Sequence, residues 1–411
     1  MLNFESLGLS QKLLRALSNE GYDTPTPVQS QAIPLLLNGK DVLGVAQTGT
    51  GKTAAFALPI LQILIKKHNS NKRNIRALVL SPTRELAAQI DERFSVYSQY
   101  TDIRHNVIFG GVSQKPQVNS LNRGIDILVA TPGRLLDLIQ QGHVDLRSVE
   151  FFVLDEADRM LDMGFINDIK KVLEKLPKER QSLFFSATMP KNIIDLSNKI
   201  LKSPQKIVAH QNSTTAETIQ QYIYYTNKST KKDLLFHILK NKDIKQILIF
   251  SRTKHGADRI VRTLKKQNIN SAAIHGDKSQ SQRQRTLKEF KENKLRVLVA
   301  TDIAARGIDI DQLNYVLNYD IPNEAETYVH RIGRCGRAGN KGISISICEP
   351  EENTYVKDIE KLISKKIDII NDNPFKQTEK PMNNQQRKEF EKEKNRKRQD
   401  FFKNRKNKRR K

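Results

Sequence analysis

Two polar segments of the chain, each directly after a short apolar run, carry side chains that could handle a nucleoside triphosphate. The first reads Ala-Gln-Thr-Gly-Thr-Gly-Lys-Thr over residues 46–53, and the second reads Asp-Glu-Ala-Asp over residues 155–158. A glycine-rich loop can turn backbone N–H groups and a lysine toward phosphates, while carboxylates at a strand end can hold Mg²⁺ and activate water. Together the two segments predict hydrolysis of ATP or GTP.

The first segment departs from the strict phosphate-loop pattern because Ala46 stands where the first glycine is usual. Gly49 and Gly51 remain, and they allow the backbone to wrap the phosphates. Lys52 is expected to reach the β- and γ-phosphates, and the Thr53 hydroxyl to bind Mg²⁺. A glycine-rich turn before a helix is the alternative, but the strand–loop–helix context argues against it. The residues predicted to bind ATP here are Ala46, Gln47, Thr48, Gly49, Thr50, Gly51, Lys52 and Thr53.

The acidic segment offers two catalytic roles. Asp155 is expected to bind Mg²⁺, partly through water, and Glu156 to activate the attacking water. Asp158 is expected to pair across a cleft between domains. Acids also favour a helix N-terminus through the helix dipole alone, so the phosphate loop upstream is what favours the catalytic interpretation.

Composition limits the possible partners. The 411 residues include 70 Lys+Arg against 45 Asp+Glu, a net charge of +25, which favours nucleic acid over a membrane. Two cysteines can build neither a disulfide framework nor a four-cysteine zinc site. This low cysteine count fits a reducing, cytoplasmic setting. The N-terminus does not look like a secretory signal, and no apolar run approaches the roughly 18 residues that span a bilayer.

Short apolar runs alternate with amphipathic stretches, a pattern typical of βαβ units and parallel sheets. The alternation predicts an α/β fold with two tandem domains, and a single phosphate loop implies a nucleotide held between them. In such sheets ligands bind beyond the carboxyl ends of the strands. The expected strands are 41–46, 76–80, 125–130, 151–154, 183–185, 246–250, 271–275, 296–300, 315–319 and 343–347, and the expected helices include 54–67, 85–94 and 135–140.

The predicted boundaries are an N-terminal segment at 1–30, an ATP-binding domain at 31–207, a linker at 208–218 and a second domain at 219–370. Residues 371–411 carry 16 Lys+Arg against 6 Asp+Glu with almost no aliphatic residues. Such a segment buries too little apolar surface to offset its ordering entropy, so we expect a disordered basic tail, with some local helix within 385–398.

In order and spacing, these segments and the motifs below resemble the DEAD-box family of ATP-dependent RNA helicases, over nearly all of residues 1–370. The resemblance implies two tandem RecA-like parallel-sheet domains, ATP with Mg²⁺, and single-stranded and duplex RNA as partner. Residues 21–29, including Tyr22, look like the family's adenine-reading Q motif. Gln29 is expected to form paired hydrogen bonds with the adenine edge, because an amide sets a donor beside an acceptor. Phe4 is expected to stack on the adenine. In isolation the segment would be a proline-rich turn.

Three further segments of the first half match the family's RNA-contacting motifs, although each alone would be an ordinary turn. They offer hydroxyls, free N–H groups and single arginines, which grip a sugar–phosphate backbone without reading bases. The implied RNA-binding residues are Pro82, Thr83, Arg84, Gly110, Gly111, Thr131, Pro132, Gly133 and Arg134.

The remaining motifs concern coupling and the second domain. Ser186 and Thr188 resemble the motif that links hydrolysis to unwinding, and their hydroxyls could hydrogen-bond the acidic segment. The resemblance assigns coupling also to Asp158 and His330, RNA contact to Gln280, Arg283, Thr301 and Asp302, ribose contact to Asp309, and arginine-finger roles to Arg334 and Arg337. Cys335 stands where threonine is commoner in the family, and an inert buried thiol is expected there.

The resemblance implies a motor in which ATP and single-stranded RNA together close the cleft and bend the RNA, so that a duplex loses a few base pairs. Contacts to phosphate and 2′-hydroxyl imply little sequence preference. The compact core with a short basic tail looks most like the bacterial RhlE-type subgroup. We expect a monomeric core, with ribosomal precursors or the RNA-decay machinery as partners.

Two alternatives stay open. A DNA helicase of the wider superfamily would share the phosphate loop and arginines, although the Q motif and the intact acidic segment argue against it. A non-enzymatic RNA-annealing or scaffold protein would act through its basic tail. Comparing ATP turnover stimulated by RNA with turnover stimulated by DNA separates an RNA helicase from a DNA helicase. Any RNA-stimulated turnover excludes the non-enzymatic scaffold.

Overall fold

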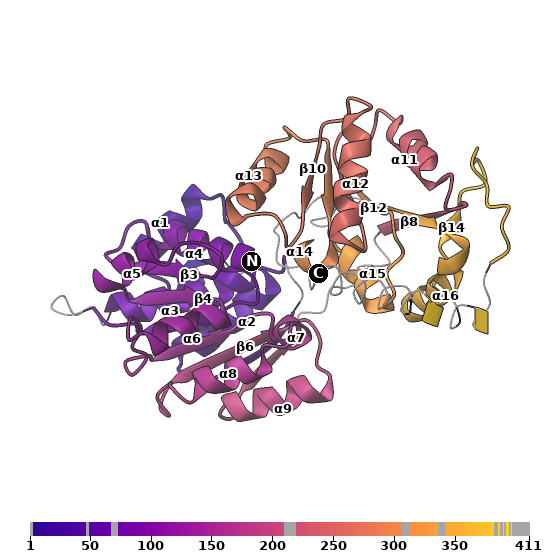
Figure 1. Cartoon of the computed structure of the whole chain (residues 1–411). Helices are drawn as coiled ribbons and strands as arrows, with labels where there is room; N and C mark the ends of the chain where they lie inside the picture. Colours follow the sequence, from indigo (N-terminus) through magenta and orange to yellow (C-terminus); the bar gives the residue numbers. More distant parts are fainter. Residues whose placement is uncertain are drawn as a thin grey trace, which may run out of the picture. The chain divides into compact units, whose positions relative to one another are not determined.

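The computed structural model describes residues 3–46, 49–66, 73–208, 219–305, 313–335 and 342–381, with residues 385, 386, 389, 392, 393 and 396. The chain divides into two units, residues 1–211 with 307–309, and residues 212–306 with 310–411 (Figure 1). In the described part of the chain, no helix is both long and apolar enough to cross a membrane. The expected linker, apart from Val208, lies outside the described residues.

The first unit is built on a seven-stranded sheet in the order β3-β4-β2-β5-β6-β1-β7, and every neighbouring pair is parallel. Its strands are β1 Val42–Val45, β2 Ala77–Leu80, β3 His105–Ile108, β4 Ile127–Ala130, β5 Phe151–Leu154, β6 Gln181–Ser186 and β7 Gln205–Val208. Its helices are η1 Glu5–Leu7, α1 Gln11–Asn19, α2 Pro27–Leu37, α3 Lys52–Lys66, α4 Arg84–Ser98, α5 Lys115–Asn122, α6 Pro132–Gln140, α7 Ala157–Asp162, α8 Ile166–Leu173 and α9 Lys191–Ile200.

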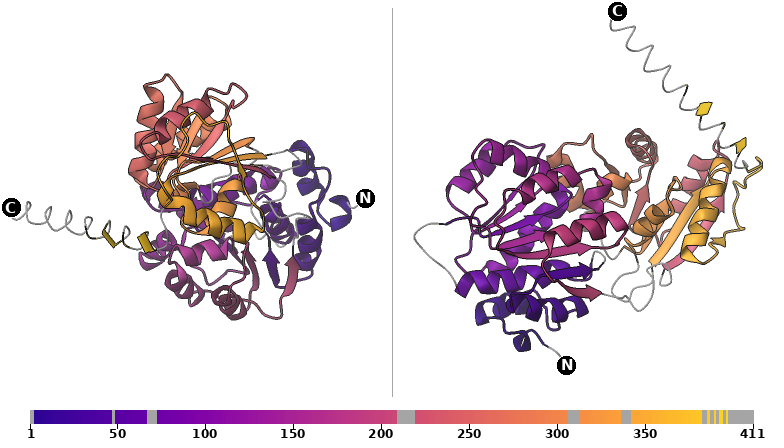
Figure 2. Two further views of the ribbon diagram at one scale, coloured as in Figure 1. Left: turned by 90° about the vertical axis from the view of Figure 1, so that its right-hand side faces the viewer. Right: turned by 90° about the horizontal axis from the view of Figure 1, so that it is seen from below.

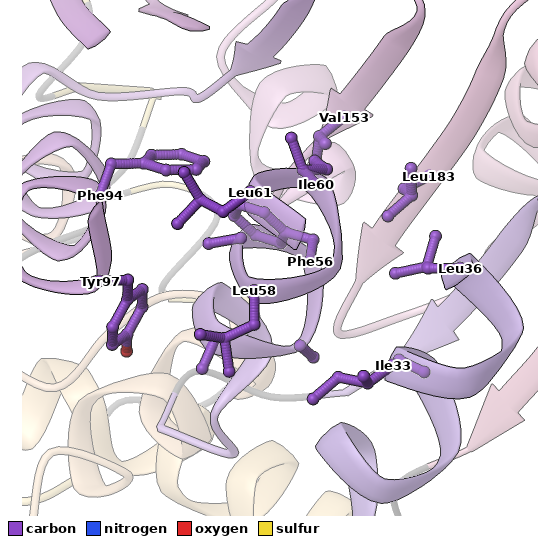
Figure 3. Close-up of a cluster of buried hydrophobic side chains, with 14 of the residues drawn as sticks. Ile33, Leu36, Phe56, Leu58, Ile60, Leu61, Phe94, Tyr97, Val153 and Leu183 are labelled. Atoms are coloured by element: carbon purple, nitrogen blue, oxygen red, sulfur yellow. The ribbon is translucent and has the colours of Figure 1, made fainter. Parts of the chain in front are cut away.

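Helices cover both faces of this sheet (Figure 2), which is why its central strands are apolar throughout rather than alternating. Ala77 and Val79 of β2 point into one core cluster, and Leu78 and Leu80 into the other. In the first cluster the ring centre of Phe56 on α3 lies 6.4 Å from that of Phe94 (Figure 3). It lies 5.7 Å from the ring centre of Phe185. This packing fixes α3, and with it the loop that precedes it.

The second unit repeats the architecture, with a parallel sheet in the order β10-β11-β9-β12-β13-β8-β14. Its strands are β8 Ile219–Tyr225, β9 Ile247–Phe250, β10 Ser271–Ile274, β11 Val297–Ala300, β12 Tyr315–Asn318, β13 Gly342–Cys348 and β14 Asp368–Ile369. Its helices are α11 Lys231–Leu239, α12 Lys254–Lys265, α13 Gln280–Lys291, α14 Asp302–Ala305, α15 Ala325–Ile332, η2 Pro350–Glu352 and α16 Asn353–Ile363. The α/β prediction with two parallel-sheet domains is confirmed.

The prediction of disorder from Asn371 onward is wrong for residues 371–381. The Asn373 side chain donates to the Tyr225 carbonyl at 2.9 Å, the Thr226 hydroxyl donates to the Phe375 carbonyl at 2.7 Å, and the Phe375 ring packs against the second core. One aromatic ring and hydrogen bonds to Tyr225 and Thr226 at the end of β8 hold a segment whose composition alone favours disorder. The remaining residues of the predicted tail are described only at six single positions.

Candidate active site

The predicted phosphate loop connects β1 to α3 at the carboxyl edge of the first sheet. The Ala46 N–H donates to the Ser186 carbonyl at 3.0 Å, which ties the start of the loop to the end of β6. Gly49 and Gly51 have φ of +83° and +85°, a left-handed conformation that residues with a Cβ rarely adopt. Gln47 and Thr48, also predicted to bind ATP, lie outside the described residues.

The structure brings the lysine of this loop to the first predicted acid. Lys52 Nζ lies 3.7 Å from Asp155 Oδ1, and both residues are buried. Burial disfavours the carboxylate and raises the pKa of Asp155 to about 6, and the Lys52 ammonium offsets only part of that effect. Asp155 Oδ1 is buried and accepts no hydrogen bond from any described residue. Such an oxygen is suited to a cation.

The predicted Mg²⁺ fits the residues at this edge. Among the described residues, no group of three or more His, Cys, Asp or Glu could hold a metal ion by itself. Mg²⁺ does not need one, because it keeps several waters and is commonly bound by one or two carboxylates together with substrate phosphates. A carboxylate oxygen that accepts no hydrogen bond from any described residue, beside a phosphate loop, meets that requirement. Thr53 and Asp155 as the ligands stay a prediction.

Glu156, the predicted water-activating residue, has an unusual backbone. Its φ of +55° and ψ of +51° lie in the left-handed region, which costs a non-glycine residue about 1–3 kcal/mol. Its carboxylate is buried and accepts a hydrogen bond from Arg159 Nη1 at 2.6 Å. Arg159 was missed in the sequence analysis, although a charge three residues after Glu156 at the start of a helix could have suggested an ion pair.

Asp158 joins the acidic segment to the segment after β6. Its Oδ2 accepts from the Ala187 N–H at 3.1 Å, the Thr188 N–H at 3.0 Å and the Thr188 hydroxyl at 3.1 Å. The expected bond between Thr188 and the acidic segment is therefore present. Ser186 Oγ instead donates to the Thr188 carbonyl at 2.7 Å. These contacts of Asp158 lie within the first domain, and its role between domains stays a prediction.

The glutamine of the predicted adenine site contacts the phosphate loop. Gln29 Nε2 donates to the Gly51 carbonyl at 3.2 Å, and Gln29 Oε1 accepts from the Thr26 N–H at 2.9 Å as half of a capping box at the start of α2. The Thr26 hydroxyl also donates to the Thr50 carbonyl at 2.9 Å. A Cβ on Gly51 would lie only 2.4 Å from Gln29 Nε2, so glycine is needed here for space as well as for φ.

The two aromatic residues of the predicted adenine site lie at the first core. Phe4 is 4% exposed and belongs to that core cluster, and Tyr22 packs against it. Little of the Phe4 ring is therefore open to a ligand in this structure. Stacking of Phe4 on adenine stays a prediction.

The three predicted RNA-contacting segments of the first domain come together after β2, β3 and β4. The Arg84 guanidinium lies against Gly111, where a Cβ would be 2.0 Å from Arg84 Nη1. Arg134 Nη2 donates to the Val112 carbonyl at 3.1 Å, while Arg134 Nη1 is buried and bonds no described residue. Thr83 caps α4 by accepting from the Leu86 N–H at 3.3 Å. Pro82, Gly110, Thr131, Pro132 and Gly133 belong to the same three segments.

In the second domain, Asp302 is held by an arginine to which the sequence analysis gave no role. Arg331 Nε and Nη2 donate to the two Asp302 oxygens at 2.6 and 2.9 Å, and Arg331 Nη1 donates to Asn318 Oδ1 at 3.2 Å. Arg331 is only 2% exposed. RNA contact by Asp302 stays a prediction, as it does for Thr301 after β11 and for Gln280 and Arg283 in the first turn of α13.

The predicted arginine fingers are only partly described. Arg334 is 4% exposed, so its guanidinium is not presented to solvent in this structure, and Cys335 is buried as expected. His330 is half-buried on α15. Arg337 and Asp309 lie outside the described residues.

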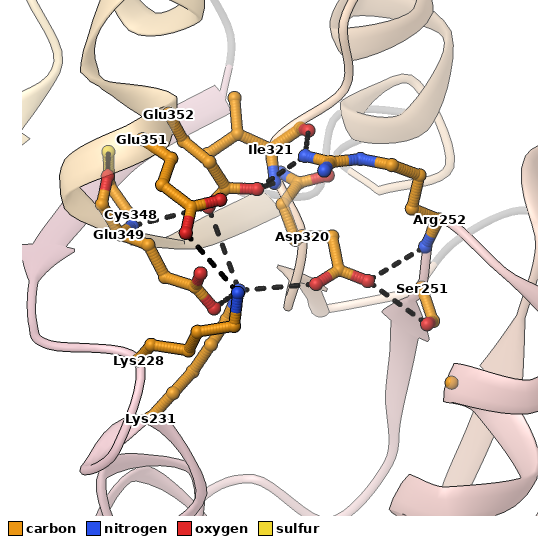
Figure 4. A network of polar contacts seen from close by, with 12 residues as sticks. Lys228, Lys231, Ser251, Arg252, Asp320, Ile321, Cys348, Glu349, Glu351 and Glu352 are labelled. Carbon is orange, nitrogen blue, oxygen red and sulfur yellow. Dashed lines mark hydrogen bonds and ion pairs between the residues drawn. The ribbon is translucent and has the colours of Figure 1, made fainter. Parts of the chain in front are cut away.

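A buried ionic network at the carboxyl edge of the second sheet was not predicted from the sequence (Figure 4). Lys231 Nζ lies 3.1 Å from Asp320, 2.8 Å from Glu349 and 3.6 Å from Glu352. Arg252 contacts Glu352, and its backbone N–H donates to Asp320 at 2.8 Å. The network joins residues after β9, β12 and β13 to the start of α11.

Comparison with known proteins agrees with this geometry. Residues 26–196 match the family model of the DEAD/DEAH box helicase, and residues 230–339 match that of the helicase conserved C-terminal domain. The ATP-dependent RNA helicase CshA of Limosilactobacillus reuteri is 42% identical over 361 residues, which cover 88% of this chain and 72% of that protein.

Two solved structures extend the likeness to the fold. A DEAD box protein from the hyperthermophile Methanococcus jannaschii is 40% identical with a TM-score of 0.53, over 90% of this chain and 99% of that one. Dbp5 of S. cerevisiae, solved with RNA and ADP BeF3, is 32% identical with a TM-score of 0.79, over 90% of this chain and 95% of that one. This chain therefore belongs to the DEAD-box family of ATP-dependent RNA helicases.

Proposed function

We propose that hydrolysis takes place at the carboxyl edge of the first sheet, with Glu156 orienting the attacking water. The observation that carries the proposal is the pair of Lys52 Nζ and Asp155 Oδ1 at 3.7 Å, with Glu156 as the next residue. Lys52 would bind the β- and γ-phosphates, and Thr53 and Asp155 would hold Mg²⁺, partly through water. When bound, Mg²⁺ would neutralise charge that develops on the phosphates.

The first-domain arginines support a grip on the RNA backbone. Arg84 and Arg134 both lie against residues 110–112, and Arg134 Nη1 is buried without a hydrogen-bond partner among the described residues. An unpaired guanidinium N–H suits a phosphate oxygen. Nothing in this set is arranged to distinguish base edges, so we propose unwinding with little sequence preference.

The second domain would complete the reaction. Arg334 and Arg337 would stabilise charge on the transferring phosphoryl group, and Asp309 would contact the ribose. Thr301 and Asp302 would contact RNA. Closure of the domains by ATP and RNA together would bend one strand, so that a short duplex opens locally.

The cellular setting is also a proposal. We propose a cytoplasmic helicase, monomeric in its core, that acts on ribosomal precursors or with the RNA-decay machinery. The RhlE-type subgroup stays a prediction, because the relative described above is a CshA protein. Crosslinking the protein to cellular RNA and sequencing the fragments would identify its substrates.

Replacement of Glu156 by glutamine tests the catalytic assignment. Glutamine keeps the size of the side chain but removes the carboxylate, so RNA-stimulated ATP turnover should fall by about 10²–10⁴ while ATP and RNA still bind. The matched control is Glu150→Gln, because Glu150 pairs with Arg76 at the opposite edge of the sheet and should not affect turnover. Near-normal turnover of Glu156→Gln would remove Glu156 from this role, and equal stimulation by DNA would favour a DNA helicase.

A further inference from the structure

Arg159 is positioned to act on the proposed water-activating residue. Arg159 Nη1 donates to Glu156 Oε2 at 2.6 Å, and the two side chains are 10% and 4% exposed. Among the described residues, no other group hydrogen-bonds the Glu156 carboxylate. A short charge-assisted bond between two buried groups holds a side chain more firmly than a bond between exposed ones.

The backbone adds to the need for such a restraint. Glu156 follows β5 by two residues and turns through a left-handed conformation before α7 begins at Ala157. This conformation sets the direction in which the side chain leaves the backbone, and non-glycine residues adopt it only when their surroundings enforce it. Arg159, on the first turns of α7, contacts that side chain from the helix that the turn initiates.

We propose that Arg159 is a positioning residue for hydrolysis. It holds Oε2 of Glu156 and thereby leaves Oε1, which no described residue hydrogen-bonds, to accept a proton from the attacking water. Arg159 itself would touch neither ATP nor water. The inference rests on the proposed role of Glu156 and adds a residue to it. A purely structural ion pair is the alternative, and it predicts lost stability without a specific loss of turnover.

The test compares Arg159→Met with Arg159→Lys in RNA-stimulated ATP hydrolysis by the full chain. Misplacement of a reacting group by about 1 Å can cost 10²-fold in rate, so Arg159→Met should lower kcat by about 10–100-fold. The KM for ATP and the affinity for RNA should stay within about twofold, because Arg159 binds neither. Lysine keeps the charge and one donor and should restore part of kcat. Arg159→Gln serves as a second uncharged variant if the methionine variant does not fold.

Arg73→Met is the matched control. It removes a guanidinium from another largely buried carboxylate of the same domain, since Arg73 Nη1 lies 2.5 Å from Asp126 Oδ2. These residues precede β2 and β4, at the edge of the sheet away from the loop. This variant should lose some stability but keep kcat.

A double variant separates the two explanations. If Arg159 acts through Glu156, then Arg159→Met should lower kcat by less than about twofold in a Glu156→Gln background, because residues that act as a unit are non-additive. Independent effects would multiply and would overturn the proposal, as would full kcat in Arg159→Met. Normal turnover of Glu156→Gln alone would instead refute the role of Glu156, so the two failures are distinguishable.

Discussion

Replacing Lys231 by methionine tests the buried ionic network of the second domain. Lys231 is 2% exposed and lies within 3.6 Å of three carboxylates. Methionine has a similar length but no charge, so Asp320, Glu349 and Glu352 would face one another with one cation fewer. Removing one partner of a buried ion pair typically costs about 3–5 kcal/mol. We expect the free energy of unfolding of the second domain to fall by about 3 kcal/mol, the lower end of that range, for two reasons. Arg252 still contacts Glu352. Burial also raises the pKa of Glu352, so this carboxylate is protonated more easily than an exposed one.

Lys228 provides the control, because it lies beside the network (Figure 4) but its side chain is largely exposed. Lys228 Nζ is 3.2 Å from Glu351 and its side chain is 67% exposed, so Lys228→Met should cost about 0–1 kcal/mol. The chain has no tryptophan, so urea unfolding is best followed by hydrogen exchange, with β9 reporting on the second domain and β2 on the first. The reasoning would be refuted if the two lysine variants lowered the free energy of unfolding by equal amounts. It would also be refuted if Lys231→Met lowered the exchange protection of β2 as much as that of β9.

Three further outcomes are expected. Burial alone would raise the pKa of Asp320, but Lys231 and Arg252 together outweigh burial and hold this pKa below its ordinary value. The stability that Asp320 contributes is therefore present above about pH 4 and is lost as the pH falls through the folded-state pKa; urea midpoints of the second domain against pH would show this. RNA-stimulated hydrolysis should favour ATP over GTP, because guanine reverses the donor and acceptor order at the edge that Gln29 would read, and equal rates would contradict the adenine site. Truncation after Pro381 removes 14 Lys+Arg and 4 Asp+Glu. RNA affinity and its salt dependence should therefore fall, while ATP turnover at saturating RNA changes little. An unchanged dependence of RNA affinity on salt would leave the tail without an RNA role.

Apolar central strands and their polar ends could be predicted, because burial on both faces of a parallel sheet requires a continuous apolar run that ends at polar residues. Four strands were missed for the same physical reason. The two-residue β14 is too short to show a pattern, β7 at the sheet edge is half polar, and β3 and β8 mix apolar with polar residues. β3, β7 and β14 are edge strands, and β8 has only the two-residue β14 on its outer side, so these positions bury less of each strand and restrict its sequence less.

Site residues could be predicted where a motif fixes the chemistry, but most bonds between side chains could not. The approach of Lys52 to Asp155 follows from two strands ending at one edge of the sheet. The pairing of Arg331 with Asp302 and the Lys231 network join residues far apart in the sequence, so no spacing could suggest them. The ion pair of Arg159 with Glu156 was missed although its i,i+3 spacing could have suggested it.

The contact of Gln29 with the loop bears on how adenine could be sensed. A primary amide has two N–H donors and two acceptor lone pairs. The structure uses one donor for the Gly51 carbonyl and one lone pair for the Thr26 N–H. No other described residue bonds this amide, so one donor and one lone pair remain, and these suffice for the paired hydrogen bonds expected with adenine. Gln29 could therefore bind adenine without releasing the loop, and the same side chain would then restrain both the base and Gly51, next to Lys52.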